Sequence, residues 1–586
     1  MDGNSAKRPN DLPTKNCQYG KNCYRKNPAH FAEYNHIHLE SIIRSHSDGE
    51  YTIPDEFSLT KDLILEQIEI VIKLFPHLSL QPQRKVQKME EDLEKVSEKP
   101  KKEEEPKLPE AGCSKDTEKR ISPPKEQTKP TRNIHDYIKV VLPKGKMAEK
   151  LKAAAPYNFF LTTITDSPNT HTESLSITLQ EILDKSLGDL ECSLQINFMV
   201  DIGWLLGHYY FAGYDQKPLI ILYGDETPDL LNISKVRPNV QAMKVPMSGP
   251  FGIHHTKMML LGYTDGSMRV VISTANLYED DWHNRTQGLW ISPKLPAIPD
   301  ASDTAFGESP TNFREDLLKY LMAYNNPKIQ NWITRVRKSN FSEVNVFLVA
   351  SVPGGHRSTP KGPIWGHPRV GHLLTQHSSK VDESCPIVGQ SSSIGSLGVS
   401  VGSWILGEWG INFRKDSAPA GLRRMPHFRM IYPSFTNVKN SHDDLLGGGC
   451  LPYQRNTNDK QPWLKNHLHQ WKSNKRHRSQ AMPHIKTYCR WSDRGLHWFL
   501  LTSANLSKAA WGAFNKSSKF EPPLRIMNYE AGVLFLPKFV TQTDTFPLDG
   551  SSIAAKVFPM PYDIPLTPYG LDDSPFLMDY LHEALK

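Results

Sequence analysis

The sequence lacks any run of about 18 apolar residues, the length that a membrane-spanning helix requires. Its first residues, MDGNSAKRPN, also lack the apolar stretch of a secretory signal. These absences argue against membrane spanning and secretion, so we expect an intracellular protein. Charge of one sign is not in large excess either, because 70 basic and 63 acidic side chains leave a formal charge of +7. That balance permits a polyanionic partner without requiring one.

Cysteine is scarce, with seven residues in a chain of 586. An odd number of scattered cysteines does not make a disulfide framework, as expected in a reducing compartment. Only Cys17 and Cys23 lie close together, and they are followed by His30 and His36. Two thiolates and two imidazoles form the closed tetrahedral set of a structural zinc site. The interval between the second cysteine and the first histidine is about half of what a DNA-reading finger needs, so we do not expect a base-reading finger.

Composition divides the rest of the chain. Residues 81–135 are rich in Lys, Glu, Pro and Ser, and such a segment cannot bury enough apolar surface to fold. We predict a disordered linker there, whose lysine clusters serve either nuclear import or a solvated, mixed-charge tether. The linker separates a Cys/His module at 1–36 and a short helical segment at 37–80 from the remainder of the chain.

From residue 136 onward, strand-like apolar segments alternate with helix-like ones. The strand-like segments include residues 217–225, 268–274, 344–351 and 531–537, and the helix-like ones lie near Leu179 and Asp316. This alternation predicts an α/β fold with sheets covered by helices. The chain is too long for one hydrophobic core, and about 150 residues per domain suggests three or four units.

One window of 28 residues occurs twice without a gap, from His255 to Trp282 and, 229 positions later, from His484 to Trp511. Seven positions are identical: His255 and His484, Lys257 and Lys486, Gly266 and Gly495, Ala275 and Ala504, Asn276 and Asn505, Leu277 and Leu506, and Trp282 and Trp511. Each window reads as strand, turn, strand, and Asp265-Gly266 suits a tight hairpin. Residues two apart on a strand face the same side, so the histidine and lysine project together. Two copies about a pseudo-two-fold axis would gather both sets in one pocket.

These residue types suit phosphoryl transfer. Its transition state spreads negative charge over the non-bridging oxygens, where a site that uses no metal needs fixed cations and donors. The two lysines and two asparagines supply them. One neutral imidazole can attack phosphorus, while the other, protonated, donates to the leaving oxygen and then activates water. A single His-x-Lys pair would more simply be a surface pair, and an inert duplication would preserve apolar rather than polar positions.

With a His-Lys-Asn variant and the phrases GIHHTKMMLL, AMPHIKTY and TSANLSKAAWG, the chain resembles the tyrosyl-DNA phosphodiesterases of the phospholipase D superfamily from about Tyr157 to Pro561. Most of the superfamily carries His-Lys-Asp instead. The resemblance implies two phospholipase D-like domains, at 136–340 and 341–586, each a mixed sheet flanked by helices. It implies a monomeric DNA-repair enzyme without a catalytic cofactor, located in the nucleus, with the cytoplasm as a further location. Its substrate would be a single- or double-stranded DNA 3′ end joined to a topoisomerase I tyrosine or another adduct.

The resemblance also assigns roles that the symmetry of the repeat leaves open, with His255 as nucleophile and His484 as general acid and base. It implies that Gln287 and Glu530 orient the two histidines, although an ordinary polar strand end is the alternative. It places four residues along the DNA groove: Phe251, Ser392, Ser393 and Ser396. From the sequence alone, the serine-rich segment QSSSIGSLG reads first as a flexible turn.

The Cys/His module resembles the poly(ADP-ribose)-binding zinc finger through Tyr19-Gly20 and Cys23-Tyr24-Arg25. The resemblance implies that Tyr19, Tyr24 and Arg25 stack on adenine and pair with phosphate in poly(ADP-ribose) or modified proteins. A purely structural zinc knob is the alternative. For the whole chain, the competing functions are a phospholipase D acting on lipid and an inert poly(ADP-ribose) reader.

Overall fold

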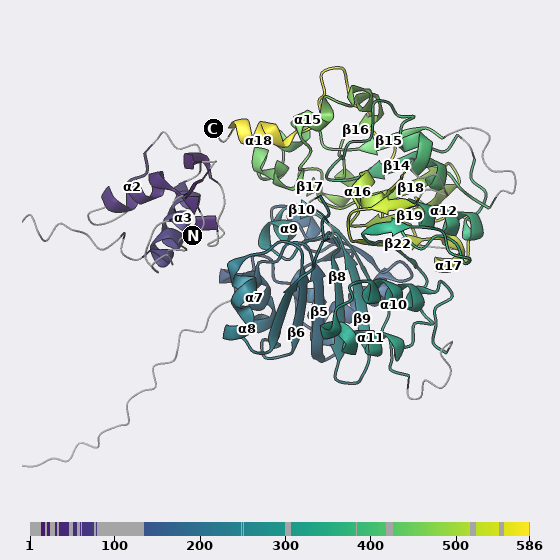
Figure 1. Ribbon diagram of the computed structural model, residues 1–586, viewed down its shortest axis with the longest axis horizontal. Coiled ribbons are helices and arrows are strands. Elements are labelled where there is room, and N and C mark those ends of the chain that lie inside the picture. The colour runs from purple at the N-terminus through teal and green to yellow at the C-terminus, as the bar shows by residue number, and fades with distance from the viewer. Residues whose placement is uncertain are drawn as a thin grey trace, which may run out of the picture. The chain divides into compact units, whose positions relative to one another are not determined.

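The computed structural model divides the chain into two compact units, residues 1–133 together with 585–586, and Ile134–Ala584 (Figure 1). Each unit is described by itself. The structure describes residues 13, 15–17, 20–23, 30–31, 34–45, 51–54, 59, 61–75, 78, 134–247, 249, 251–298, 306–382, 384–417, 426–515, 523–549 and 556–584. Nearly all of the predicted linker at 81–135 lies outside these residues.

The larger unit contains a mixed sheet of eight strands in the order β4-β3-β11-β9-β8-β5-β6-β7. Their bounds are β3 Phe159–Thr162, β4 Ser176–Ile177, β5 Leu190–Asn197, β6 Leu219–Tyr223, β7 Val240–Lys244, β8 Met258–Tyr263, β9 Met268–Ser273 and β11 Gly288–Ile291. Every residue of β8 and β9 is buried, because helices or the other half of the unit cover both faces of these central strands.

A second mixed sheet has seven strands in the order β12-β22-β19-β18-β14-β15-β16. Their bounds are β12 Phe347–Ser351, β14 Ile387–Gln390, β15 Phe428–Ile431, β16 Leu468–His469, β18 Thr487–Ser492, β19 Gly495–Thr502 and β22 Glu530–Phe535. This sheet has the same topology as the run from β3 to β7 in the first sheet. Chain order, neighbours and strand directions all agree: the first four pairings across each sheet are antiparallel and the last two are parallel. The duplicated α/β fold is therefore confirmed.

Helices flank the two sheets. The longer ones are α5 Met147–Ala154, α7 Ile202–Ala212, α8 Pro228–Val236, α10 Phe313–Ala323, α11 Gln330–Arg337 and α12 Gly366–His377. Figure 1 shows α7 and α8 on one side of the first sheet and α10 and α11 on the other. Helix α7 begins after Asp201, whose side chain accepts the Trp204 N–H at 3.0 Å, and ends at Gly213, whose φ of 80° suits glycine.

The shorter helices of this unit fill connections. They are α6 Leu179–Ile182, α9 Glu279–His283, α13 Gly410–Phe413, α14 Phe435–Lys439, α15 Arg455–Asn458, α16 Lys508–Trp511, α17 Pro537–Val540 and α18 Met578–Ala584. Helix α6 ends at Ile182, and the Asp184 side chain then accepts the Ser186 N–H and starts a separate 3₁₀ turn at Lys185–Leu187. The domain limits near residue 340 stay a prediction; they fall between α11 and β12.

The two halves of the larger unit are joined through short parallel strands, β10 Arg285–Thr286 and β17 Met482–Pro483, which lie side by side in Figure 1. The packing beside them is close, since a Cβ on Gly288 would lie 2.6 Å from Ile485 Cδ1. Glycine at this position lets the edge of one repeat approach the segment that carries His484 in the other.

The smaller unit combines the Cys/His module with two helices, α2 Ile37–Ser45 and α3 Lys61–Leu74. Phe31 of the module is buried in the same apolar cluster as residues of both helices, including Ile42 and Ile68. The Cys/His module and the helical segment therefore share one core. Within the part of the chain that the structure describes, no helix is long and apolar enough to cross a membrane.

Candidate active site

The structure places the repeated polar residues at equivalent points of the two sheets. In each repeat, the histidine and lysine directly precede the first strand of the hairpin, and the asparagine lies three residues beyond the second strand. These residues are His255, Lys257 and Asn276 around β8 and β9, and His484, Lys486 and Asn505 around β18 and β19. Gly266 lies in the first hairpin turn with φ of 80°, and Gly495, with φ of 125°, is the first residue of β19, directly after the second turn.

His255 is oriented by a carboxylate from the other repeat. Its Nδ1 lies 3.0 Å from Glu530 Oε2, and the same carboxylate accepts bonds from the Ser503 hydroxyl at 2.5 Å and the Asn528 amide at 3.0 Å. Burial alone would raise the pKa of Glu530, but His255 and these donors hold it below its usual range. An ionised Glu530 accepts a hydrogen bond from Nδ1–H, which leaves the lone pair of His255 on Nε2.

His484 is oriented by two groups from the first repeat. Its Nδ1 lies 3.1 Å from Gln287 Nε2 and 3.2 Å from Asp281 Oδ2. The Thr274 hydroxyl donates to Gln287 Oε1 at 2.8 Å, which turns the amide nitrogen toward His484. The amide is a donor and the carboxylate an acceptor, so this environment accommodates Nδ1 both without and with a proton.

Gln287 and Glu530 occupy the same place in the duplicated fold. Gln287 directly precedes β11, Glu530 is the first residue of β22, and these strands correspond in the two sheets. The hydroxyls that hold them, Thr274 and Ser503, are also 229 positions apart. Each repeat therefore supplies the group that orients the histidine of the other. Their assignment to the catalytic machinery remains a prediction from the resemblance.

Asp281 is a residue that the sequence reasoning did not find. It is fully buried, accepts the Asn276 N–H at 2.6 Å and faces His484. Burial alone would raise the pKa of Asp281, but the neighbouring His484 holds it well below its usual range. The second repeat has Ala510 at the matching position, so a search for identities passes over it. The sequence signal that could have indicated Asp281 is its place directly before Trp282, which aligns with Trp511.

The two lysines are buried and bound to the chain that carries the histidines. Lys257 Nζ donates to the carbonyl oxygen of His255 at 2.8 Å, and Lys486 Nζ donates to that of His484. Burial lowers the pKa of Lys257 to about 8, and burial together with the charge of Lys257 lowers the pKa of Lys486 to about 7. The Lys257 ammonium also lies 5.6 Å from the centre of the Phe198 ring. Both amino groups are thus buried in one site, within electrostatic reach of each other.

The same environment favours neutral histidines in the free protein. Burial and then the charge of Lys257 lower the pKa of His255. Burial lowers the pKa of His484 to about 3, although Asp281 opposes the shift. Lysines of one repeat act on the histidine of the other, which shows that the two sets lie within electrostatic reach. A phosphodiester anion in this site would favour protonation of one of the imidazoles.

Hydrogen bonds hold the side chains of both asparagines. The predicted DNA-groove residues divide into two that contact Asn505 and two that are exposed. Asn505 Oδ1 accepts the Ser392 hydroxyl at 3.2 Å and the Ser393 N–H at 3.0 Å, so these serines adjoin the site. Ser396 and Phe251 are exposed, and Phe251 has 75% of its surface accessible. Both side chains are accessible to solvent, and their place on a DNA path stays a prediction. In the other repeat, Asn276 Oδ1 accepts the Met199 N–H at 3.4 Å.

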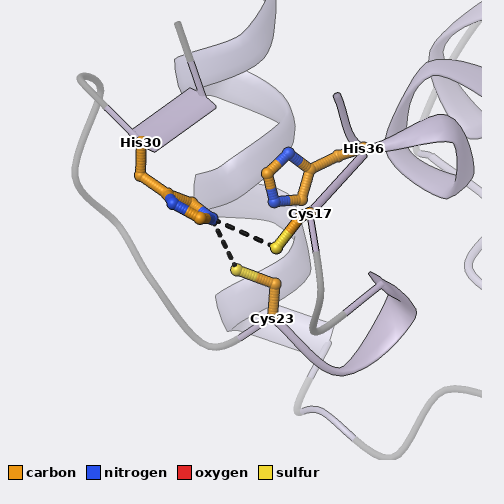
Figure 2. Close-up of side chains that lie close together, drawn as sticks. All are labelled: Cys17, Cys23, His30 and His36. Carbon is orange, nitrogen blue, oxygen red and sulfur yellow. Dashed lines mark hydrogen bonds between the residues drawn. The ribbon is translucent and has the colours of Figure 1, made fainter. Parts of the chain in front are cut away.

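The predicted zinc ligands come together in the smaller unit (Figure 2). Cys17, Cys23, His30 and His36 are buried, and one ligand atom from each lies within 4.8 Å of the others. His30 Nε2 lies 3.3 Å and 3.2 Å from the two sulfurs. His36 Nδ1 donates to the Tyr34 carbonyl at 2.9 Å, and within the described residues its Nε2 has no hydrogen-bond partner. This donor set could hold a zinc ion.

The finger is supported by the helices that follow it. The Gln67 side chain on α3 donates to the carbonyl oxygen of Cys23. The predicted poly(ADP-ribose) contacts, Tyr19, Tyr24 and Arg25, lie outside the described residues. Their roles remain predictions from the resemblance.

Comparisons with known proteins give a family for each part of the chain. A family model described as tyrosyl-DNA phosphodiesterase matches residues 158–570, and one described as a PBZ domain matches residues 14–38. Tyrosyl-DNA phosphodiesterase 1 of Drosophila melanogaster is 56% identical over 590 residues, covering 97% of this chain and 100% of that protein. A probable tyrosyl-DNA phosphodiesterase of Caenorhabditis elegans is 34% identical, covering 68% of this chain and 85% of that protein.

A solved structure shares the fold. The crystal structure of the yeast tyrosyl-DNA phosphodiesterase superposes with a TM-score of 0.54 at 21% identity, covering 72% of this chain and 98% of that chain. At this identity, the likeness bears on the architecture of the duplicated unit.

Proposed function

Since the chain belongs to the tyrosyl-DNA phosphodiesterase family, and is therefore a DNA-repair phosphodiesterase, we propose that it releases a topoisomerase I tyrosine or another blocking group from a DNA 3′-phosphate. The observation that carries the proposal is the reciprocal orientation of the two histidines. Glu530 accepts a hydrogen bond from Nδ1–H of His255, and Gln287 with Asp281 faces Nδ1 of His484. A protein that serves only as a structural scaffold does not need two buried histidines with such partners.

In the proposed first step, His255 Nε2 attacks phosphorus, and the bond from phosphorus to the tyrosyl oxygen breaks. His484 gives that oxygen its proton. In the second step, His484 takes a proton from water, the water oxygen attacks phosphorus, and the bond to His255 breaks. The products are a DNA 3′-phosphate and the original His255. Lysine and asparagine donors stabilise the non-bridging oxygens in both steps.

The partners of Nδ1 support this division of roles. Among the described residues, His255 Nδ1 has a carboxylate as its hydrogen-bond partner, which keeps one tautomer and an Nε2 lone pair suited to attack. His484 has both a donor amide and an acceptor carboxylate, which suits an imidazole that gains and loses a proton. We propose that Asp281 stabilises the protonated state of His484 and that Gln287 stabilises the neutral state.

The direct test uses purified full-length protein and an oligonucleotide with a 3′-phosphotyrosyl group. We expect release of tyrosine and a 3′-phosphate end, and we expect the rate to persist with excess chelator, because the proposed steps use only protein groups. Choline release from phosphatidylcholine vesicles without oligonucleotide cleavage would instead favour a lipid substrate. No turnover of either substrate would favour an inert reader.

We further propose that the finger holds a structural zinc ion and binds poly(ADP-ribose), recruiting the enzyme to damaged DNA in the nucleus. The gathered Cys/His donors and the match to a PBZ domain support this role.

The Cys23→Ala protein should lose its zinc, and its binding of poly(ADP-ribose) should fall about tenfold or more. The reason is that a structural zinc ion contributes much of the folding free energy of a small finger. Zinc content and filter retention measure the two effects. Oligonucleotide cleavage should be unchanged, and Cys192→Ala, which alters a half-buried cysteine of the larger unit, should change neither property. Full retention by Cys23→Ala would remove the finger from this role.

A further inference from the structure

We propose that Tyr320 and Tyr324, at the end of helix α10, position His255 through a hydrogen-bonded chain that fastens the residues on both sides of it. The inference rests on the proposed function, in which His255 attacks phosphorus. It concerns how the attacking nitrogen is aimed, because Tyr320 and Tyr324 touch its neighbours and not the imidazole itself.

The chain runs between two buried residues, His254 and Thr256. The Thr256 hydroxyl bonds the Tyr320 hydroxyl, which lies 3.0 Å from the Tyr324 hydroxyl. Tyr324 in turn lies 3.0 Å from His254 Nε2, and His254 Nδ1 lies 3.0 Å from the carbonyl oxygen of Asn197. The side chains of residues 254 and 256 are thus both tied to one helix, and His255 stands between them.

Chemistry fixes the direction of donation along this chain. Burial lowers the pKa of His254 to about 3, so its ring is neutral and carries one proton. A carbonyl oxygen can only accept, so Nδ1 donates to Asn197 and Nε2 accepts from Tyr324. Tyr324 must then accept from Tyr320, and Tyr320 from Thr256. Each hydroxyl between the ends of this chain both donates and accepts a hydrogen bond, and such a network resists rearrangement of its side chains more than separate hydrogen bonds do.

The end of α10 also holds the orienting carboxylate. The Tyr324 and Tyr529 rings stack at 4.7 Å with 13° between their planes, and the Tyr529 hydroxyl donates to the carbonyl oxygen of Ala323 at 3.2 Å. The Tyr529 carbonyl accepts the His255 N–H at 3.0 Å, and the next residue is Glu530. Through Tyr529, the end of α10 therefore helps to fix both the backbone of His255 and the carboxylate that faces its Nδ1.

The second repeat has no chemical equivalent of this chain. The residues on either side of His484 are Pro483 and Ile485, whose side chains have no hydrogen-bonding groups. That segment is held through its backbone, by pairing of β10 with β17 and by Gln390, which donates to the Ile485 carbonyl at 2.8 Å. The tyrosine chain serves one histidine alone. In-line attack on phosphorus demands close alignment of the attacking His255, since a displacement of about 1 Å costs roughly 100-fold in rate.

The test is the single-turnover release of tyrosine from a 3′-phosphotyrosyl oligonucleotide by the full-length Tyr324→Phe protein. Phenylalanine keeps the stack on Tyr529 and removes the hydroxyl that joins His254 to Tyr320. We expect release to slow about fivefold to tenfold, with unchanged binding of an uncleavable oligonucleotide, as expected from the loss of one to two neutral hydrogen bonds. Tyr432→Phe is the matched control, because the buried Tyr432 hydroxyl has no hydrogen-bond partner among the described residues.

A second pair of variants separates positioning from stability. Thr256→Val removes the hydroxyl at nearly constant shape and should slow release like Tyr324→Phe, whereas Thr256→Ser keeps it and should restore the rate. Slower release in Thr256→Val with full recovery in Thr256→Ser supports the inference. A lowered melting temperature with an unchanged rate in folded Tyr324→Phe and Thr256→Val would overturn it. An inert wild-type protein would instead overturn the proposed function.

Discussion

The His255→Ala protein is expected to release tyrosine from a 3′-phosphotyrosyl oligonucleotide about 10⁴- to 10⁶-fold more slowly than the wild type. Removal of a covalent nucleophile has effects of this order, because the remaining donors stabilise charge but no group forms the intermediate. Alanine also leaves the buried Glu530 without its Nδ1 donor. Single-turnover cleavage measures the rate, and intact-protein mass spectrometry should find no covalent DNA adduct.

The matched control for this variant is His497→Ala. His497 is a buried histidine on β19 whose Nε2 lies 2.9 Å from the Ser492 hydroxyl, away from the repeated polar set. It should keep nearly all activity. Equal losses in the two variants would mean that removal of any buried histidine damages the fold, and an adduct on the His255→Ala protein would show that another residue attacks.

The sequence predicts most of the candidate active site because the duplication preserves it. Polar residues that recur at one spacing at the ends of hairpin strands are not explained by packing, which would preserve apolar positions instead. The hairpin follows from Asp265-Gly266, and the structure places Gly266 in the turn with φ of 80°. The Cys/His cluster follows for a similar reason, since four potential ligand residues within a short segment can meet without a long-range fold.

The cross-repeat pairing is not accessible to a comparison of aligned windows. Gln287 lies 11 positions after Asn276, whereas Glu530 lies 25 positions after Asn505, because a longer connection precedes β22. Their equivalence becomes visible only through strand order, which long-range pairing decides. Tyr324 was likewise out of reach, since it meets His254 across 70 positions.

Asp281 shows a different limit of reasoning from a repeat. Symmetry draws attention to what two copies share, but two histidines with different tasks need different surroundings. Ala510, which aligns with Asp281, cannot offer a carboxylate. His254 and Thr256, which bond to the two tyrosines, align with Pro483 and Ile485. The differences between the copies therefore carry information on the division of roles.

The His484→Ala protein is expected to accumulate DNA attached to His255. Tyrosine leaves as a phenol with an ordinary pKa near 10, so the first step tolerates the loss of its acid better than the second tolerates the loss of its base. Attack by water on the adduct should slow by about 10²- to 10⁴-fold, the usual contribution of a general base. Peptide mass spectrometry after incubation with the 3′-phosphotyrosyl oligonucleotide should find the adduct in the peptide that contains His255.

The location of that adduct decides between the two assignments of the histidines. A DNA adduct on His484 in the His255→Ala protein, together with none on His255 in the His484→Ala protein, would exchange the two roles. His484→Asn is the matched variant, because it retains a polar group beside Asp281 and Gln287 but cannot act as a base at neutral pH. If it holds the adduct as long as His484→Ala does, proton transfer is the missing function; rapid decay with asparagine would instead mean that His484 only orients the attacking water.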